Sequence, residues 1–306
     1  MIAFLFPGQG SQYPGMGKQL VENFPRARQT YEEASDALGF DMAALCFDGS
    51  EDDLRLTANT QPAILTTSIA TLRVLEQETG LTPGCAAGHS LGEFSALVAV
   101  GALNFGDAVR TVRQRGTFMQ DAVPVGVGAM AAVMGVDRES LEQICQQAAA
   151  GEIVAPANFN SPGQIVIAGH ATAVGRAIVL AKEQGAKRAM LLPVSAPFHS
   201  ALMQPAAERL EETLAALEIG TFRCPVVGNV EASSYSEPQR VKELLVKQVC
   251  SAVRWDESVI EMDRLGVTRY VEIGPGKVLC GLVKRIVKGS DTEQVDSVDT
   301  LAKLTL

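Results

Sequence analysis

The sequence predicts an α/β protein whose main domain carries a smaller, inserted α+β subdomain. Two observations support this fold class. Short apolar runs that end in glycine-containing turns, such as 2–10 and 85–92, alternate with segments of helical spacing, as expected where buried strands feed helices. Between about 129 and 194 the rhythm changes, and the elements follow the β-α-β-β-α-β order of the ferredoxin-like motif.

The main domain is predicted from both ends of the chain. Its expected elements are helical segments over 19–38 and 60–80, a strand, sharp turn and helix over 85–103, a helix over about 106–120, strands over 225–230 and 269–275, and a closing helix over 276–288. In the closing helix the spacing places Lys277, Lys284 and Lys288 on one stripe. That stripe is either a solvated face or a docking surface for an acidic partner.

The inserted subdomain has its own order of elements. These are strands over 129–136, 153–159, 164–169 and 186–194, and helices over 138–151 and 172–185. The segments 123–128 and 193–198 are rich in glycine and proline and suit hinges at which a subdomain leaves and rejoins the main domain. We therefore expect a main domain formed by 1–126 and 195–306, and a small subdomain formed by 127–194.

Composition limits the classes of partner and compartment. The formal net charge of -9 argues against nucleic acid or an anionic membrane as the general partner. The six cysteines are scattered without a CxxC pair or a Cys/His cluster, so neither a zinc site nor a disulfide framework is expected. The N-terminal apolar run is too short for a signal peptide, and no stretch approaches the ~20 residues that span a bilayer. These features predict a soluble, cytoplasmic protein.

The segment from Gly88 to Gly92 matches the pattern G-x-S-x-G between a predicted strand and a predicted helix. The glycines allow a turn so tight that the Ser90 hydroxyl is exposed, and the backbone N–H of Leu91 points toward a developing oxyanion. This context predicts that Ser90 is a nucleophile. The alternative is a tight turn without chemistry.

The chain has three histidines that could act as the base for Ser90. His89 is adjacent to the serine, where neighbouring side chains diverge, and His170 precedes a subdomain helix as a surface or capping residue. His199 follows a strand next to a predicted hinge, where loops normally place reactive groups, so elimination leaves it as the base. Aspartates between Ser90 and His199 fall at helix edges, so a backbone carbonyl or an amide side chain could orient the imidazole instead of a carboxylate.

Arg115 lies on an otherwise apolar stripe of the 106–120 helix, together with Ala108, Val112 and Met119. An arginine in such a place must either extend to the surface or meet an anion. One possibility is a buried pair with a protein carboxylate. The other is a bidentate clamp for a carboxylate of the substrate.

These motifs together resemble the malonyl-CoA:acyl-carrier-protein transacylase family over nearly the whole chain. The segments that carry the resemblance are FPGQGSQ at 6–12, GHSLGEFSAL at 88–97, QRG at 114–116, NFNSPGQIVIAG at 158–169, APFH ending at His199, and EIGPGKVL at 272–279. The resemblance implies an α/β-hydrolase-like main domain with a ferredoxin-like insertion.

The resemblance also implies roles for individual residues. Ser90 would be the nucleophile, His199 the base and Arg115 the ligand of the malonyl carboxylate, while the backbone amides of Gln9 and Leu91 would form the oxyanion hole.

Three further positions follow from the same resemblance. Gln248, or a main-chain carbonyl around Asn229, would support the histidine. Leu91 after the serine and Phe198 before the histidine are similar to the malonyl-selective members, whereas methylmalonyl-selective members tend to carry Gln and Ser there.

The implied activity is a ping-pong transfer of malonyl from coenzyme A to the phosphopantetheine thiol of an acyl carrier protein, without a metal or redox cofactor. A serine esterase or thioesterase built on the same turn is the alternative enzyme, against which Arg115 and the missing acid both count. A catalytically idle module that binds a carrier protein is the alternative from another class. The carrier could belong to fatty acid or to polyketide synthesis.

Overall fold

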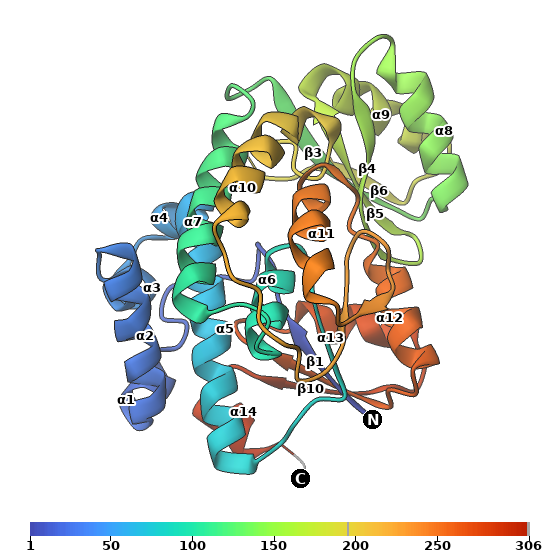
Figure 1. Ribbon diagram of the computed structural model, residues 1–306. Coiled ribbons are helices and arrows are strands. Elements are labelled where there is room, and N and C mark those ends of the chain that lie inside the picture. The colour runs from blue at the N-terminus through green and yellow to red at the C-terminus, as the bar shows by residue number, and fades with distance from the viewer. Residues whose placement is uncertain (195, 305–306) are drawn as a thin grey trace.

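The computed structural model describes residues 1–194 and 196–304, which form a larger and a smaller lobe around separate sheets (Figure 1). The larger lobe contains a six-stranded sheet in the order β10-β9-β1-β2-β7-β8. Its strands are β1 (Ile2–Phe6), β2 (Cys85–Gly88), β7 (Val226–Val227), β8 (Ser234–Tyr235), β9 (Arg269–Ile273) and β10 (Asp291–Val295). Neighbouring strands run parallel, except that β7 and β8 pair antiparallel.

Helices cover both faces of this sheet, as the alternation along β1 requires. Phe4 and Phe6 pack into the core beneath α2, α5, α6, α7, α10 and α11, whereas Ala3 and Leu5 pack against α12 and α13. The helices of the larger lobe are α1 (Lys18–Asn23), α2 (Pro25–Leu38), α3 (Met42–Asp48), α4 (Glu51–Arg55), α5 (Thr57–Thr79), α6 (Leu91–Ala99), α7 (Phe105–Asp121), α10 (Gln204–Ala215), α11 (Pro238–Cys250), α12 (Trp255–Arg264), α13 (Val278–Ile286) and α14 (Val298–Ala302).

The smaller lobe is the upper right part of Figure 1 and has a core of its own. Its antiparallel sheet has the order β4-β5-β3-β6 and is covered by two helices. The elements are β3 (Gly128–Met134), α8 (Arg138–Ala149), β4 (Val154–Ser161), β5 (Gln164–His170), α9 (Ala171–Glu183) and β6 (Arg188–Leu191). This β-α-β-β-α-β order confirms the predicted fold class. The domain boundaries after 126 and 194 stay a prediction, and residue 195 lies outside the described residues.

The two lobes are joined along β4. The amide of Phe159 donates to the carbonyl of Val253, and the amide of Val253 donates to the carbonyl of Ala157, each at 2.9 Å. These main-chain bonds connect the smaller lobe to the segment before α12. They therefore fix the position of the smaller lobe relative to the large sheet.

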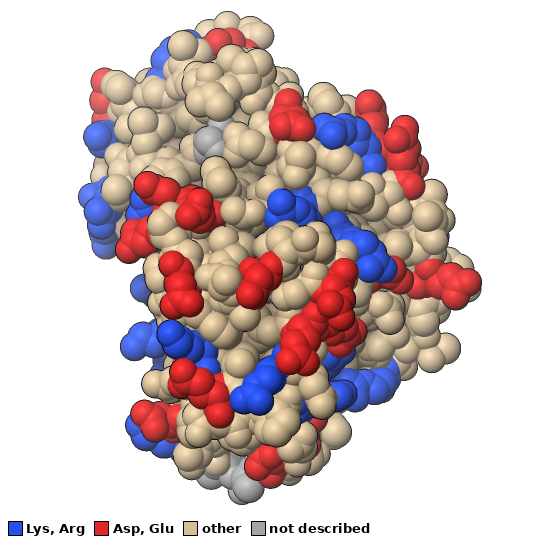
Figure 2. All heavy atoms as spheres, turned by 90° about the vertical axis from the view of Figure 1, so that its left-hand side faces the viewer, with Lys and Arg blue, Asp and Glu red and all other residues tan. Residues whose placement is uncertain are grey.

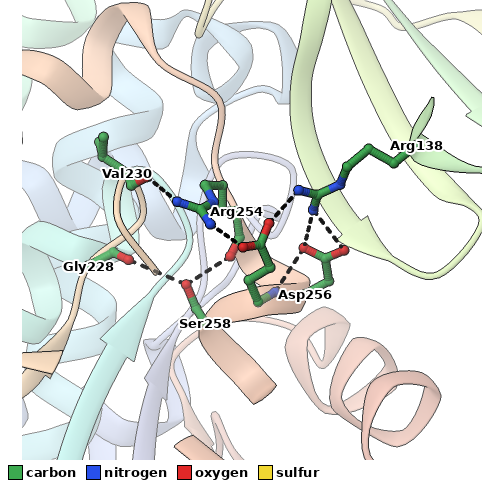
Figure 3. A network of polar contacts seen from close by, with 7 residues as sticks. Arg138, Gly228, Val230, Arg254, Asp256 and Ser258 are labelled. Atoms are coloured by element: carbon green, nitrogen blue, oxygen red, sulfur yellow. Dashed lines mark hydrogen bonds and ion pairs between the residues drawn. The ribbon is translucent and has the colours of Figure 1, made fainter. Parts of the chain in front are cut away.

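Charged side chains reinforce the same junction (Figure 3). Arg138, at the start of α8, forms ion pairs with Glu257 at 2.5 Å and with Asp256 at 3.2 Å. Arg254 pairs with the same Glu257 and donates to the carbonyl of Val230 at 3.3 Å. The network therefore connects the smaller lobe to the turn around 228–230, which lies beside the site described below.

The C-terminal end of the fold differs from the prediction. The closing helix α13 spans only Val278–Ile286, and β10 and α14 follow it. Asp291–Val295 is polar at four of five positions and lies at the edge of the sheet, so no apolar run marks it as a strand. Lys277 is the residue before α13 and Lys288 lies beyond its end, so these two do not share one helical stripe with Lys284.

No helix among the described residues is long and apolar enough to cross a membrane. Acidic and basic side chains are interspersed on the face shown in Figure 2.

Candidate active site

The sharp turn between β2 and α6 places Ser90 at its apex. Ser90 has φ 51° and ψ -104°, a positive-φ conformation outside the left-handed helical region that is unfavourable for any residue with a Cβ. A strained turn of this kind between a strand and a helix lifts the side chain of the apex residue out of the backbone. The predicted exposure of the Ser90 hydroxyl thus has a structural basis.

Two glycines allow this turn to pack closely. A Cβ atom on Gly88 would lie 2.0 Å from the carbonyl carbon of Gly92, and a Cβ on Gly92 would lie 2.1 Å from the carbonyl oxygen of Phe6. Since both contacts are with backbone, no side-chain movement could relieve them. The glycines of the G-x-S-x-G pattern are therefore required by the close approach of α6 to β1 and to the turn itself.

The structure brings His199 to Ser90. The Oγ of Ser90 and the Nε2 of His199 are 2.7 Å apart, and the Nδ1–H of His199 donates to the main-chain carbonyl of Gln248 at 2.8 Å. Because the carbonyl can only accept, it fixes the tautomer in which Nδ1 carries the proton and Nε2 is free to accept the serine proton. Burial, and next the Arg115 cation, lower the pKa of His199 to about 3, so the ring is neutral at physiological pH.

The other two histidines contact different groups. The Nε2 of His89 lies 2.8 Å from the Oδ1 of Asn160 in the smaller lobe, and burial lowers the pKa of His89. The Nδ1 of His170 accepts the amide of Ile153 at 2.9 Å. His199 is the histidine that is hydrogen-bonded to Ser90.

Arg115 is 1% exposed and reaches the same serine. Its Nη2 donates to the Ser90 Oγ at 3.1 Å and to the Oε1 of Gln248 at 2.9 Å, and its Nη1 donates to the Oε1 of Gln61 at 2.8 Å. All three acceptors are neutral, so the predicted alternative of a buried ion pair is not what the described residues form. Burial lowers the pKa of Arg115 to about 10, which leaves it a cation at neutral pH.

A cavity of about 120 Å³ lies over these groups, between the two lobes. Ser90, Arg115 and His199 line it together with three further residues predicted from the resemblance, namely Gln9, Leu91 and Phe198. The smaller lobe contributes Met130 and Asn158. Leu91 is the first residue of α6, where a backbone N–H has no acceptor within the helix and is available to a ligand.

The two residues expected to support the histidine have separate positions. Gln248 contacts His199 through its main chain only, and its side chain is directed to Arg115. Asn229 does not contact His199: its main-chain carbonyl accepts from Arg254, and its Oδ1 accepts the amide of Ser90 at 2.7 Å. The expectation for Asn229 differs from the structure because the carbonyl that faces the histidine comes from α11 and not from the 228–230 turn.

Two contributors to the site were not found from the sequence. Gln61, in α5, binds Arg115, and Glu93, in α6, is buried beneath the turn. A glutamine and a glutamate within helices carry no signal of their own, because only the packing of distant elements shows what they face. The three lysines of the predicted stripe line neither this cavity nor the neighbouring one.

A second cavity of about 180 Å³ adjoins the first and shares Gln9 and His89 with it. It extends to Val278 and Leu282 of α13. The described residues contain no group of three or more His, Cys, Asp or Glu side chains that could hold a metal ion.

The comparisons with known proteins agree on one family. The model of the family described as acyl transferase domain matches residues 3–304. The malonyl CoA-acyl carrier protein transacylase of Bacillus subtilis (strain 168) is 52% identical over 301 residues, which cover 98% of this chain and 95% of the relative. The protein of that name from Escherichia coli (strain K12) is 50% identical over 286 residues, covering 94% of this chain and 93% of the relative.

Solved structures give the same result and confirm the family resemblance. An acyl carrier protein S-malonyltransferase from Vibrio cholerae superposes with a TM-score of 0.97 at 50% identity and covers 99% of both chains. A type II PKS acyl-carrier protein in complex with its malonyl-transacylase contains a chain with a TM-score of 0.97 at 47% identity, covering 99% of this chain and 98% of that one.

Proposed function

This chain belongs to the acyl transferase domain family, and from that membership we propose that it transfers malonyl from coenzyme A to the phosphopantetheine thiol of an acyl carrier protein through an ester on Ser90. The observation that carries the proposal is the pair of hydrogen bonds on the Ser90 Oγ. The Ser90 hydroxyl donates one of them to the Nε2 of the neutral base His199, and it accepts the other from the buried cation Arg115. A nucleophile, a base and a site for an anionic acyl group thus share one cavity.

In the first half-reaction the Ser90 proton passes to the Nε2 of His199 while Oγ attacks the thioester carbon. The carbonyl oxygen becomes an oxyanion that the backbone amides of Gln9 and Leu91 stabilise. When the carbon–sulfur bond breaks, the leaving thiolate of coenzyme A takes the proton from His199. In the second half-reaction the carrier thiol gives its proton to His199 and attacks the ester carbon, and the proton then returns to Ser90.

Arg115 supplies the preference for malonyl. A carboxylate that enters a largely apolar cavity loses its hydration, and a guanidinium can replace it with two charge-assisted hydrogen bonds. Leu91 and Phe198 are nearly buried in the wall of the cavity and limit the space beside the acyl chain. The cation also argues against the alternative, a general serine esterase or thioesterase, because neutral acyl groups would leave it without an anion.

Support of the histidine is assigned to the main-chain carbonyl of Gln248, and Asn229 is assigned to holding the backbone of the turn. The second cavity is proposed as the path of the phosphopantetheine arm, since it meets the first at Gln9 and His89.

A cytoplasmic location is proposed because the six cysteines are all free thiols. Domain boundaries at 126/127 and 194/195 are proposed because the smaller lobe has a core of its own within 131–189.

Intact-mass measurement tests the proposal. The chain is mixed with malonyl-CoA or acetyl-CoA, and its Ser90→Ala variant serves as the control. We expect malonyl-CoA to add one malonyl mass to the unsubstituted chain, acetyl-CoA to add far less, and Ser90→Ala to add neither. Labelling that persists in Ser90→Ala, for example on a cysteine, would exclude the Ser90 ester.

A further inference from the structure

Glu93 is a buried acid for which the mechanism above has no use. It is the third residue of α6 and is 1% exposed. Its carboxylate accepts hydrogen bonds from the Nε2 of Gln248 at 2.7 Å, the amide of Asn229 at 3.2 Å and the hydroxyl of Tyr235 at 3.4 Å. All of these donors are neutral. A carboxylate buried without a contacting cation is costly, so its position directly beneath Ser90 requires an explanation.

The side chain of Gln248 connects this acid to Arg115. The Nε2 of Gln248 donates to Glu93, while its Oε1 accepts from the Nη2 of Arg115 at 2.9 Å. A carboxylate can only accept and a guanidinium can only donate, so the amide between them has one allowed orientation. The acid and the arginine are therefore held one amide apart. Burial lowers the pKa of Arg115, and the negative charge of Glu93 acts in the opposite direction and raises it.

This spacing has a consequence for the acyl carboxylate. If Glu93 contacted Arg115 directly, it would occupy the guanidinium fork that the substrate needs. At the distance of one amide it leaves the guanidinium with neutral acceptors alone, which a substrate carboxylate can displace, but it lowers the positive potential there. A transferase must bind the carboxylate on the donor thioester and then release it on the product thioester, and an anion site that binds both too tightly gains nothing in rate.

We propose that Glu93 is a positioning residue that acts through Gln248 and Arg115 to weaken the binding of the malonyl carboxylate, so that the product can leave. The proposal rests on the proposed function, because it assumes that Arg115 binds that carboxylate. It predicts that removal of the negative charge at position 93 strengthens malonyl binding, which is the opposite of what damage to the site would do.

Few other titrating groups face Glu93. Arg115 remains a cation, and burial raises the pKa of the Tyr235 hydroxyl well above its ordinary value, so that it remains neutral. His199, on the other side of Ser90, is neutral as well. Burial raises the pKa of Glu93 itself to about 7. Acidification from pH 8 to pH 6 should therefore neutralise Glu93 while its neighbours keep their charge.

Calorimetric binding of malonyl-CoA and acetyl-CoA to Ser90→Ala tests the proposal without acylation. At pH 8 the added substitution Glu93→Gln should tighten malonyl-CoA binding by about 3- to 20-fold, as expected for a like charge removed at roughly 10 Å, and leave acetyl-CoA binding unchanged. In Ser90→Ala alone, the ratio of the malonyl to the acetyl affinity should rise from pH 8 to pH 6. In Ser90→Ala/Glu93→Gln the ratio should stay flat. The coenzyme phosphates titrate equally in both ligands and cancel in the ratio.

Glu272→Gln is the matched control. Glu272 is also completely buried, and it accepts the backbone amides of Leu279 at 3.0 Å and Cys280 at 2.7 Å. Its substitution should leave the affinity ratio unchanged at both pH values.

Weaker malonyl-CoA binding in Ser90→Ala/Glu93→Gln, or equal changes for the two ligands, would overturn the role of Glu93. If this variant does not fold, the pH dependence of Ser90→Ala alone decides, and a flat ratio would overturn the role. Failure of the proposed function has a different signature: Ser90→Ala would then bind malonyl-CoA no better than acetyl-CoA, and Arg115→Ala in that background would not change the ratio.

Discussion

The Ser90 Oγ and the His199 Nε2 lie 2.7 Å apart although 109 residues separate them in the chain. Both residues have a positive φ, 51° for Ser90 and 60° for His199, which costs free energy in each case. The surroundings hold both backbones in place: Asn229 accepts the amide of Ser90, and the carbonyl of Gln248 accepts the imidazole N–H. The nucleophile and the base are thus aligned before any substrate binds.

Replacement of His199 tests its role as the base. His199→Ala should slow acylation of Ser90 by roughly 10²–10⁴-fold, the usual range for a positioned general base, when single-turnover acylation is followed by intact mass. His170→Ala is the control and should stay within a few-fold of the unsubstituted chain, because His170 binds the amide of Ile153 in the smaller lobe. If the two variants behaved alike, another group would have to be the base.

Replacement of Arg115 separates a malonyl transferase from a general esterase. Loss of one partner of a buried charge pair typically costs about 2–5 kcal/mol, so Arg115→Ala should lower kcat/KM for malonyl-CoA by roughly 30- to several-thousand-fold. The value for acetyl-CoA should hold steady or improve, because the unpaired cation is gone. Arg115→Lys should recover part of the loss, since an ammonium lacks the planar fork. Equal losses for the two substrates would mean that Arg115 only maintains the fold.

The pH dependence of acylation follows from the same arginine. The pKa of His199 is lowered to about 3 by burial and then by the Arg115 cation. A base is lost as the pH falls through its pKa, so removal of the cation, which raises that pKa, should move the acid limb to higher pH. Acetylation by acetyl-CoA should therefore decline at a higher pH in Arg115→Ala than in the unsubstituted chain. The pH dependence of single-turnover acetylation is compared for the two proteins. If their acid limbs coincide, Arg115 does not act on the pKa of His199.

The turn around Ser90 was predictable from the local sequence. The G-x-S-x-G pattern, the apolar strand before it and the helix after it are local features, and the structure has each of them where they were expected. The order of elements in the smaller lobe was predictable for the same reason, since a turn sequence separates β4 from β5. His199 was predictable because only three histidines exist.

Contacts between distant helices were not predictable. Gln248 was expected near His199, but whether its main chain or its side chain would face the ring depends on how α11 packs. Glu93 reads as an ordinary acid in the first turn of a helix, where it would favour the helix dipole. Its burial beneath Ser90 arises only when α11 and the turn containing Asn229 close over it.

The basic residues near α13 remain candidates for contact with the carrier, although they do not form a single helical stripe. Substitution of Lys277, Lys284 and Lys288 by Glu should raise KM for an acidic carrier protein at low salt and leave self-acylation by malonyl-CoA unchanged, because the lysines line neither cavity. Lys303→Glu, after α14, is the control for a single charge reversal away from α13. An unchanged KM for the carrier would mean that these lysines are ordinary solvated side chains without a role in carrier binding.

Transfer from the isolated acyl-enzyme tests the central claim most directly. The chain is treated with malonyl-CoA, freed of coenzyme A and mixed with an acyl carrier protein that bears phosphopantetheine, and both proteins are weighed over time. A transferase that works through Ser90 predicts that the malonyl mass leaves the chain and appears on the carrier in a single turnover, faster than it is lost to water when the carrier is absent. Loss of the malonyl mass to water at the same rate with or without the carrier, with no gain of mass on the carrier, would contradict the account and favour a thioesterase.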